Sequence, residues 1–242
     1  MIEYGNLIYE DNSFNRVIDT VPHAKELIFH ENTIIISDKT QKHIFDVINV
    51  EKVIFNKKLY YIPKNFLKHS AIKEIDLSKT NISSIHQEAF FDCENLEKII
   101  LPSSLSKIGS NAFTYCEKLK EIDLSNTKIE VIRNETFVHC INLSKIFFPD
   151  TLKRIDNFVF YNCKNLKEIT IPNNFKDFYL NLFMENGIKK VYYNNLDEYT
   201  KKIFETLCKE NDVKLVANDL DALLSENKSF KEINNILKQQ ER

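Results

Sequence analysis

The chain has 242 residues, 43% of them hydrophobic and 28% charged, which is enough apolar material for one sizeable core or an elongated array of repeats. Its 33 basic and 35 acidic residues leave a formal net charge of −2. This balance argues against a nucleic-acid partner, because binding to phosphates requires concentrated positive charge. No apolar run approaches the roughly 20 residues that span a bilayer, so we also expect no membrane insertion.

Residues 1–50 are expected to form an N-terminal cap that contains a degenerate repeat. Strands are predicted within residues 6–20 and 27–37. The first residues, Met1 to Asn6, lack the basic start and the apolar stretch of a secretory signal. The sequence therefore predicts a cytoplasmic protein, with the cell surface or secretion as the alternative.

Residues 51–195 contain an internal repeat of 23 or 24 residues. Four phenylalanines recur at this spacing, and each is followed at three-residue steps by a cysteine, a leucine and an isoleucine. The phenylalanines are Phe90, Phe113, Phe137 and Phe160, and the cysteines are Cys93, Cys116, Cys140 and Cys163. Within the segment L-x-x-I-x-L, the isoleucine and second leucine are two residues apart, so both point to one face of a strand. Each repeat is therefore predicted to be one coil of a solenoid, closed only by its neighbours.

A second period of 47 residues lies on top of the first. The segment that runs from Ile72 to Thr80 reappears from Leu119 to Thr127, and Leu101-Pro102 is echoed by Phe148-Pro149. The array is therefore interpreted as a duplicated two-coil unit.

These repeats resemble the BspA-type leucine-rich repeats, whose consensus has the same AF-x2-C-x2-L-x2-I-x-LP core. The pairs Ala89-Phe90 and Ala112-Phe113, the four cysteines and the Leu-Pro and Phe-Pro pairs carry the resemblance, over about residues 62 to 194. It implies an α/β-type repeat solenoid: a leucine-rich-repeat horseshoe with a concave parallel β-sheet, an irregular convex side and a helical C-terminal cap. Known members of the family mostly serve adhesion, host contact or other protein binding.

The position just before the inward isoleucine alternates in charge from coil to coil. It reads Glu26, Lys52, Glu74, Lys98, Glu121, Lys145, Glu168, Lys190 and then Asp212. In a parallel stack, each of these charges lies between two opposite ones. We interpret this ladder as structural, because it helps to specify the stacking register.

The position just after the inward isoleucine is the predicted partner-binding column. It reads Ile54, Asp76, Ile100, Asp123, Phe147, Thr170 and Tyr192. Apolar residues that face solvent between polar ones fit the usual composition of protein-binding hot spots, with Ile100, Phe147 and Tyr192 as anchors and the aspartates as specifiers. The alternative is that these residues are present for their strand propensity alone.

The cysteines are predicted to be structural thiols, because zinc ligands come as close pairs and none occurs here. His139 beside Cys140 is only a weak catalytic signal, so we expect no catalytic residues, no metal and no cofactor. A less favoured hypothesis makes Cys208 a nucleophile, which would require an exposed thiol of lowered pKa.

Residues 196–242 are predicted to form a mostly helical C-terminal cap that is continuous with the array. Apolar residues at helical spacing predict an amphipathic helix from Leu196 to Glu210, followed by a strand at Val213–Val216 and two short helices. The sequence as a whole predicts a monomeric, non-enzymatic module that binds a protein partner on its concave sheet. An exported adhesin or host-interaction effector is the alternative.

Overall fold

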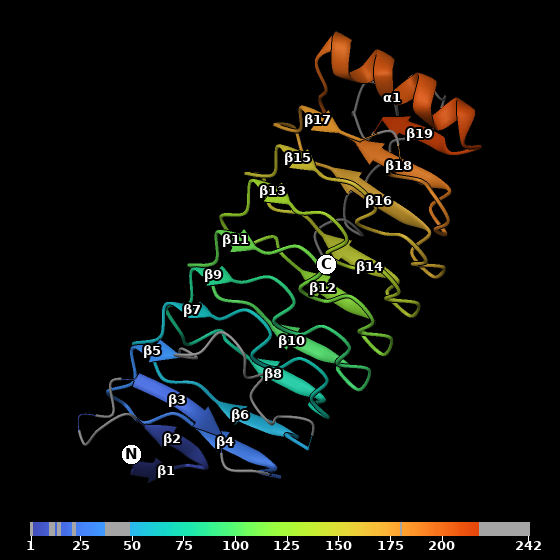
Figure 1. Cartoon of the computed structure of the whole chain (residues 1–242). Coiled ribbons are helices and arrows are strands. Elements are labelled where there is room, and N and C mark those ends of the chain that lie inside the picture. Colours follow the sequence, from blue (N-terminus) through green and yellow to red (C-terminus); the bar gives the residue numbers. More distant parts are fainter. Residues whose placement is uncertain are drawn as a thin grey trace, which may run out of the picture.

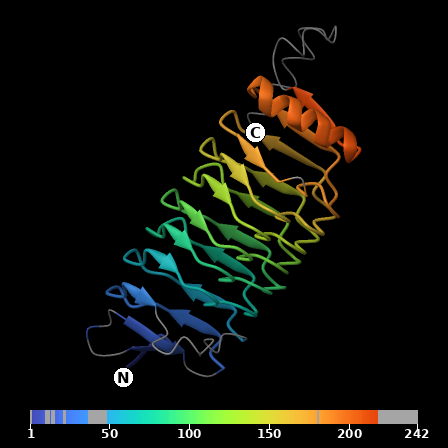
Figure 2. The same ribbon diagram turned by 45° about the horizontal axis from the view of Figure 1, so that its top comes forward.

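The computed structural model describes residues 2–9, 13, 16–20, 23–36, 49–179 and 181–217. These residues wind into an elongated solenoid whose coils stack along one axis (Figures 1 and 2). The predicted fold class is confirmed.

The first strand of each coil belongs to what we call the long-strand face. Its strands are β4 (Glu26–Ile28), β6 (Lys52–Ile54), β8 (Glu74–Asp76), β10 (Lys98–Ile100), β12 (Glu121–Asp123), β14 (Lys145–Phe147), β16 (Glu168–Ile171), β18 (Lys190–Tyr193) and β19 (Lys214–Ala217). In strands β8, β10, β12 and β14 the middle isoleucine is buried and both neighbours are exposed. This is the two-residue alternation that the sequence predicted.

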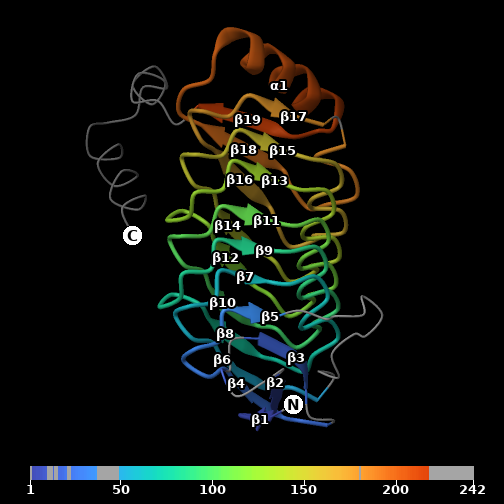
Figure 3. The same cartoon turned by 60° about the vertical axis from the view of Figure 1, so that its left-hand side comes forward.

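The second strand of each coil belongs to the short-strand face, which was not predicted. Its strands are β5 (Ile35–Ile36), β7 (Tyr61–Ile62), β9 (Ser84–Ile85), β11 (Lys107–Ile108), β13 (Val131–Ile132), β15 (Arg154–Ile155) and β17 (Asp177–Phe178). They pair in parallel, for example β7 with β9 and β9 with β11. The side that was expected to be irregular therefore contains a second parallel ladder, seen beside the first in Figure 3.

A column of stacked phenylalanines fills the corner that follows each short strand. The ring of Phe113 lies between those of Phe90 and Phe137, at centroid distances of 5.2 and 5.6 Å, and the ring planes are within 10° of parallel. All three side chains are fully buried. Each phenylalanine thus closes the apolar interior of its own coil and packs on the next, as the repeat spacing predicted.

Two residues per coil adopt left-handed backbone conformations at this corner. They recur at the repeat spacing as Glu88, Asn111, Glu135 and Phe158 and, four residues later, as Asp92, Tyr115, His139 and Asn162. Positive φ values disfavour side chains with a Cβ, and none of these eight residues is glycine. The stacking of the coils must therefore hold the corner in shape.

The N-terminal end is closed by antiparallel strands. Strands β1 (Ile2–Tyr4), β2 (Leu7–Tyr9) and β3 (Arg16–Thr20) form a small meander, and β3 then pairs in parallel with β5. Because β4 already pairs with β6 on the long-strand face, the first repeat begins within the predicted cap.

The C-terminal end is closed by helix α1 (Glu198–Glu210) and strand β19, in agreement with the predicted helix and strand. Asp197 caps the helix by accepting hydrogen bonds from the Thr200 amide and hydroxyl. The ring of Phe204 packs on Phe178 at a centroid distance of 4.0 Å, which anchors α1 on the last coil. The two further predicted helices lie outside the described residues. In the part of the chain that is described, no helix is long and apolar enough to cross a membrane.

Candidate functional site

The structure brings together the seven residues of the predicted column. Each is the third residue of its strand on the long-strand face, and the register places Asp76 beside Ile100, Asp123 beside Phe147 and Thr170 beside Tyr192. Ile54, Ile100 and Phe147 are 42%, 39% and 46% exposed, whereas Tyr192 is half-buried. The column also continues at both ends, because Ile28 pairs with Ile54 and Val216 pairs with Tyr192.

Asp76 and Asp123 have a local role that the prediction did not include. Their carboxylates accept hydrogen bonds from the main-chain amides of Ser78 and Ser125, at 2.8 and 2.9 Å. These bonds stabilise the turn that ends each strand. The bonds from Ser78 also hold the pKa of Asp76 below its usual value. The two aspartates therefore shape the edge of the column.

Every second step of the charge ladder pairs in the predicted register. Glu74 lies beside Lys98, Glu121 beside Lys145 and Glu168 beside Lys190, and Lys52 forms an ion pair with Glu26. The last step of the prediction is wrong, because Lys214, and not Asp212, pairs with Lys190. Asp212 lies in the preceding turn, 3.8 Å from Lys189. The alternation therefore ends in two neighbouring lysines.

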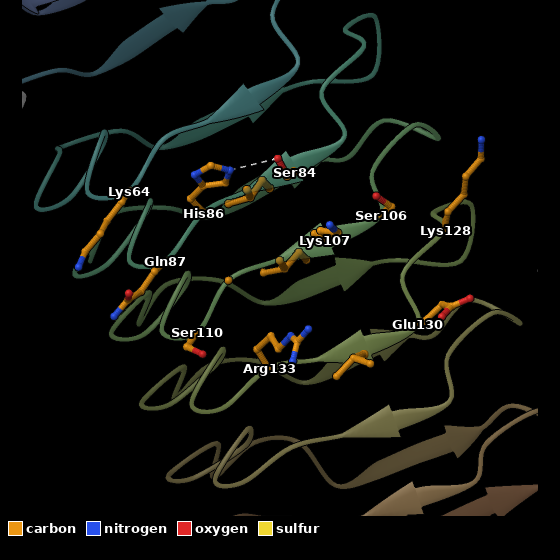
Figure 4. A pocket seen from close by; sticks show the side chains of 14 residues that line it. Lys64, Ser84, His86, Gln87, Ser106, Lys107, Ser110, Lys128, Glu130 and Arg133 are labelled. Carbon is orange, nitrogen blue, oxygen red and sulfur yellow. Dashed lines mark hydrogen bonds between the residues drawn. The ribbon is translucent and has the colours of Figure 1, made fainter. Parts of the chain in front are cut away.

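A hollow of about 920 Å³ lies on the short-strand face, across β9 to β13 and beside Lys64, which follows β7, and was not predicted (Figure 4). Two small residues, Ser84 and Gly109, are among those that line it. A Cβ built on Gly109 would lie 2.4 Å from the main-chain nitrogen of Gln87, so the two coils touch here. The small residues and the lysines that line the hollow are present in the sequence, but only the register of the short strands shows that they lie side by side.

A ladder of aromatic side chains runs along the corner of the coils. Phe91, Tyr115, His139 and Tyr161 succeed one another at centroid distances of 5.6, 4.6 and 6.1 Å. Together with Phe158 they line a shallow groove of about 320 Å³. The His139 Nδ1 atom lies 2.8 Å from the Asn162 side-chain amide. His139 thus belongs to an inter-coil contact and does not face the Cys140 thiol, which is buried.

The four cysteines of the repeat form the predicted buried column. Burial raises the pKa of the Cys93 and Cys163 thiols to about 12 and those of Cys116 and Cys140 well above the ordinary value. Cys208 is 2% exposed, and burial raises the pKa of its thiol to about 11. A nucleophile needs the opposite environment, so the structure counts against the Cys208 hypothesis. Among the described residues, no three potential metal ligands gather into a cluster.

The chain resembles known repeat proteins in sequence and in fold. The model of the BspA type leucine rich repeat region matches six copies, over residues 23–140, 83–212 and 130–236. None of the curated proteins matches the chain.

Several solved structures resemble it. A leucine rich cell surface protein from Faecalibacterium prausnitzii A2-165 aligns with a TM-score of 0.66 at 18% identity, over 80% of this chain and 54% of that protein, so the chain spans about half of that protein's length. A leucine-rich repeat protein from T. pallidum aligns with a TM-score of 0.47 at 19% identity, over 85% of this chain and 75% of that one. The repeat match and the solenoid agree, and the chain belongs to the BspA-type leucine-rich-repeat family.

Proposed function

We propose that this chain is a non-enzymatic interaction module that holds a protein partner on its long-strand face. Leucine-rich repeats of this family are in general modules for protein interaction or surface adhesion. The proposal concerns which face binds and which residues make the contact. It rests on the exposed apolar residues of the column.

The observation that supports this site is a comparison between equivalent positions of neighbouring coils. Ile100 and Phe147 point to solvent, while Asp76 and Asp123 occupy the same strand position one coil away. Since the fold accepts a charged residue at this position, core packing does not require an apolar one. Strand propensity favours isoleucine and phenylalanine, but threonine satisfies it equally at Thr170. An apolar anchor that recurs at every second coil is better explained by contact with a partner.

The dimensions of the face fit an ordinary interface. Neighbouring strands are about 4.8 Å apart, so nine strands give a face roughly 40 Å long. An interface of standard size covers about 800 Å² on each partner. The anchors at Ile54, Ile100 and Phe147 lie two coils, about 10 Å, apart, which lets one globular surface contact all three.

A comparison of variants tests this site. Ile100→Ala/Phe147→Ala is compared with Tyr60→Ala/Tyr179→Ala, which removes two side chains of 56% and 43% exposure from positions outside the column. Proteins captured from the native cell by each variant are quantified by mass spectrometry. We expect a protein that wild type and the tyrosine variant retain and that the column variant loses by about tenfold. Equal capture by all three would exclude the column.

A surface adhesin is the second candidate. The Faecalibacterium prausnitzii protein of similar fold is described as a cell surface protein, whereas the N-terminal sequence predicted a cytoplasmic one. Proteolysis of intact cells, followed by detection of the chain with an antibody, separates the two. Loss of the full-length chain while a cytoplasmic marker survives would support the adhesin.

A further inference from the structure

The hollow on the short-strand face owes its shape to a contrast in side-chain size. The small residues Ser84 and Gly109 line it beside the larger His86, whose ring stacks on that of Tyr61 at a centroid distance of 5.1 Å. In Figure 4 the Ser84 hydroxyl lies against the His86 ring, at 3.3 Å from Nε2, and Lys107 lies between His86 and Arg133. The result is an open trough that crosses four coils, with a surface lined by serine hydroxyls and long basic side chains.

The hollow carries an excess of positive charge, whereas the chain as a whole is slightly negative. Four cations, Lys64, Lys107, Lys128 and Arg133, line it together with one carboxylate, Glu130, although the chain as a whole carries a formal charge of −2. Glu130 is paired with Lys153 at 2.9 Å, outside the hollow. Arg133 lies 3.9 Å from Asp156.

Within the part of the chain that the structure describes, the three lysines of the hollow are not held by ion pairs, a property that they share with other exposed lysines of the solenoid such as Lys73 and Lys120. Over the described residues, none of their ammonium groups has a carboxylate within ion-pair distance, whereas Lys52, Lys68 and Lys153 do. Positive charge repelled by its neighbours and left without a counter-charge is unfavourable for folding. Its concentration in a hollow therefore favours a negatively charged ligand.

The arrangement of these cations indicates a chain-like ligand. Lys64, Lys107 and Lys128 belong to different coils and do not converge on one point, as they would around a single phosphate. Lysine also lacks the fork of donors that arginine offers to phosphate groups. The hollow covers three steps between coils, roughly 14 Å, which an extended peptide spans in four or five residues.

We propose that this hollow binds an acidic, extended segment of a polypeptide, with carboxylates on Lys64, Lys107 and Lys128. Ser110 and Gln87 also line the hollow and offer polar groups to the main chain of such a segment. The site is on a different face from the apolar column. The proposed peptide site therefore does not depend on the function proposed above, and each can be tested separately.

The test uses a fluorescent ten-residue peptide of alternating glutamate and serine, and its glutamine counterpart, with binding followed by anisotropy. The variant Lys64→Gln/Lys107→Gln/Lys128→Gln is compared with Lys73→Gln/Lys79→Gln/Lys120→Gln. All six lysines are exposed, and both variants lose the same charge. We expect the glutamate peptide to bind wild type, the hollow variant to bind it about tenfold more weakly, and the control variant to stay within about twofold of wild type.

Three results would overturn the proposal: no binding of the glutamate peptide, equal weakening by both triple variants, or equal binding of the glutamine peptide. Competition with inorganic phosphate and with heparin addresses other anions. If either displaces the peptide at concentrations below the peptide's own Kd, the hollow is a general anion site and the proposal fails. The variant Ile100→Ala/Phe147→Ala should bind the glutamate peptide as wild type does, which separates this site from the column.

Discussion

The Cys140 thiol donates a hydrogen bond to the main-chain carbonyl oxygen of Phe113, one coil earlier, at 3.1 Å. The same bond joins Cys116 to Phe90 at 3.3 Å and Cys163 to Phe137 at 3.0 Å. In the coil before Cys93 the equivalent position is Ser70, whose hydroxyl lies 3.3 Å from the Cys93 sulfur. The cysteine of this repeat is thus a small buried side chain that links each coil to the previous one.

Buried thiols of raised pKa make stability depend on pH in the alkaline range. The folded chain keeps the Cys93 and Cys163 protons until about pH 12, whereas the unfolded chain releases them from about pH 9.0. Stability is therefore complete below pH 9 and falls as the pH rises toward 12, by up to about 1.4 kcal/mol per thiol and pH unit. Guanidinium unfolding at pH 7, 8, 9 and 10 measures this loss.

Serine at these positions provides the control, because Ser70 already occupies the equivalent site. Cys93→Ser/Cys163→Ser should show a shallower loss above pH 9 than wild type does. If the two slopes are equal, other groups cause the alkaline unfolding.

The phenylalanine column predicts a large and local loss of stability. Phe113 is fully buried and packs between two rings, so Phe113→Ala should lower the unfolding free energy by about 3–5 kcal/mol. Phe113→Leu keeps most of the volume and should cost less than half as much, since Leu67 occupies the equivalent position of an earlier coil. Urea unfolding followed by circular dichroism measures both. Equal losses would show that the column does not depend on filled volume.

The parts of the molecule that could be predicted from the sequence are those in which every coil has the same type of residue at the same position. Phe113, Cys116 and Ile122 recur as Phe137, Cys140 and Ile146, and one set of apolar anchors implies one way of stacking. The exposed column could be predicted from the position of these buried anchors, because a strand alternates its side chains between two faces.

The short-strand face could not be predicted in the same way, because its strands have two residues and show no alternation. From β7 to β15 the constant feature is one inward isoleucine, as in Ile85 and Ile108, which follows a residue that changes from Ser84 to Lys107. The hollow depends on size differences between residues such as Ser84 and Val131, two coils apart. Those size differences indicate a hollow only when the structure shows which residues of neighbouring coils lie side by side.

The left-handed corner residues predict a difference in stability between two substitutions. Glu135 has φ 58° and is exposed, and Asn111 occupies the same position one coil earlier, also with φ 58°. Asparagine tolerates this conformation better than glutamate does. We expect Glu135→Asn to raise the unfolding free energy by about 0.5 kcal/mol relative to Glu135→Ala, which also loses the hydrogen bond to Asn111 but keeps the strain. Thermal melts of the two variants decide this. A less stable asparagine variant would mean that the corner is not strained.

The end of the charge ladder predicts a gain from reversing one charge. Lys214 pairs in register with Lys190, which lies beside Glu168 on its other side. Like charges directly opposite each other destabilise a sheet, so Lys214→Glu should restore the alternation and stabilise the chain by about 0.5 kcal/mol at low salt. Lys202→Glu makes the same change of net charge on the exposed surface of α1 and serves as the control. Because salt screens exposed pairs, the difference between the two melting temperatures should shrink as salt is raised from about 0.01 to 1 M. A difference that does not depend on salt would assign the effect to the residue itself and not to its charge.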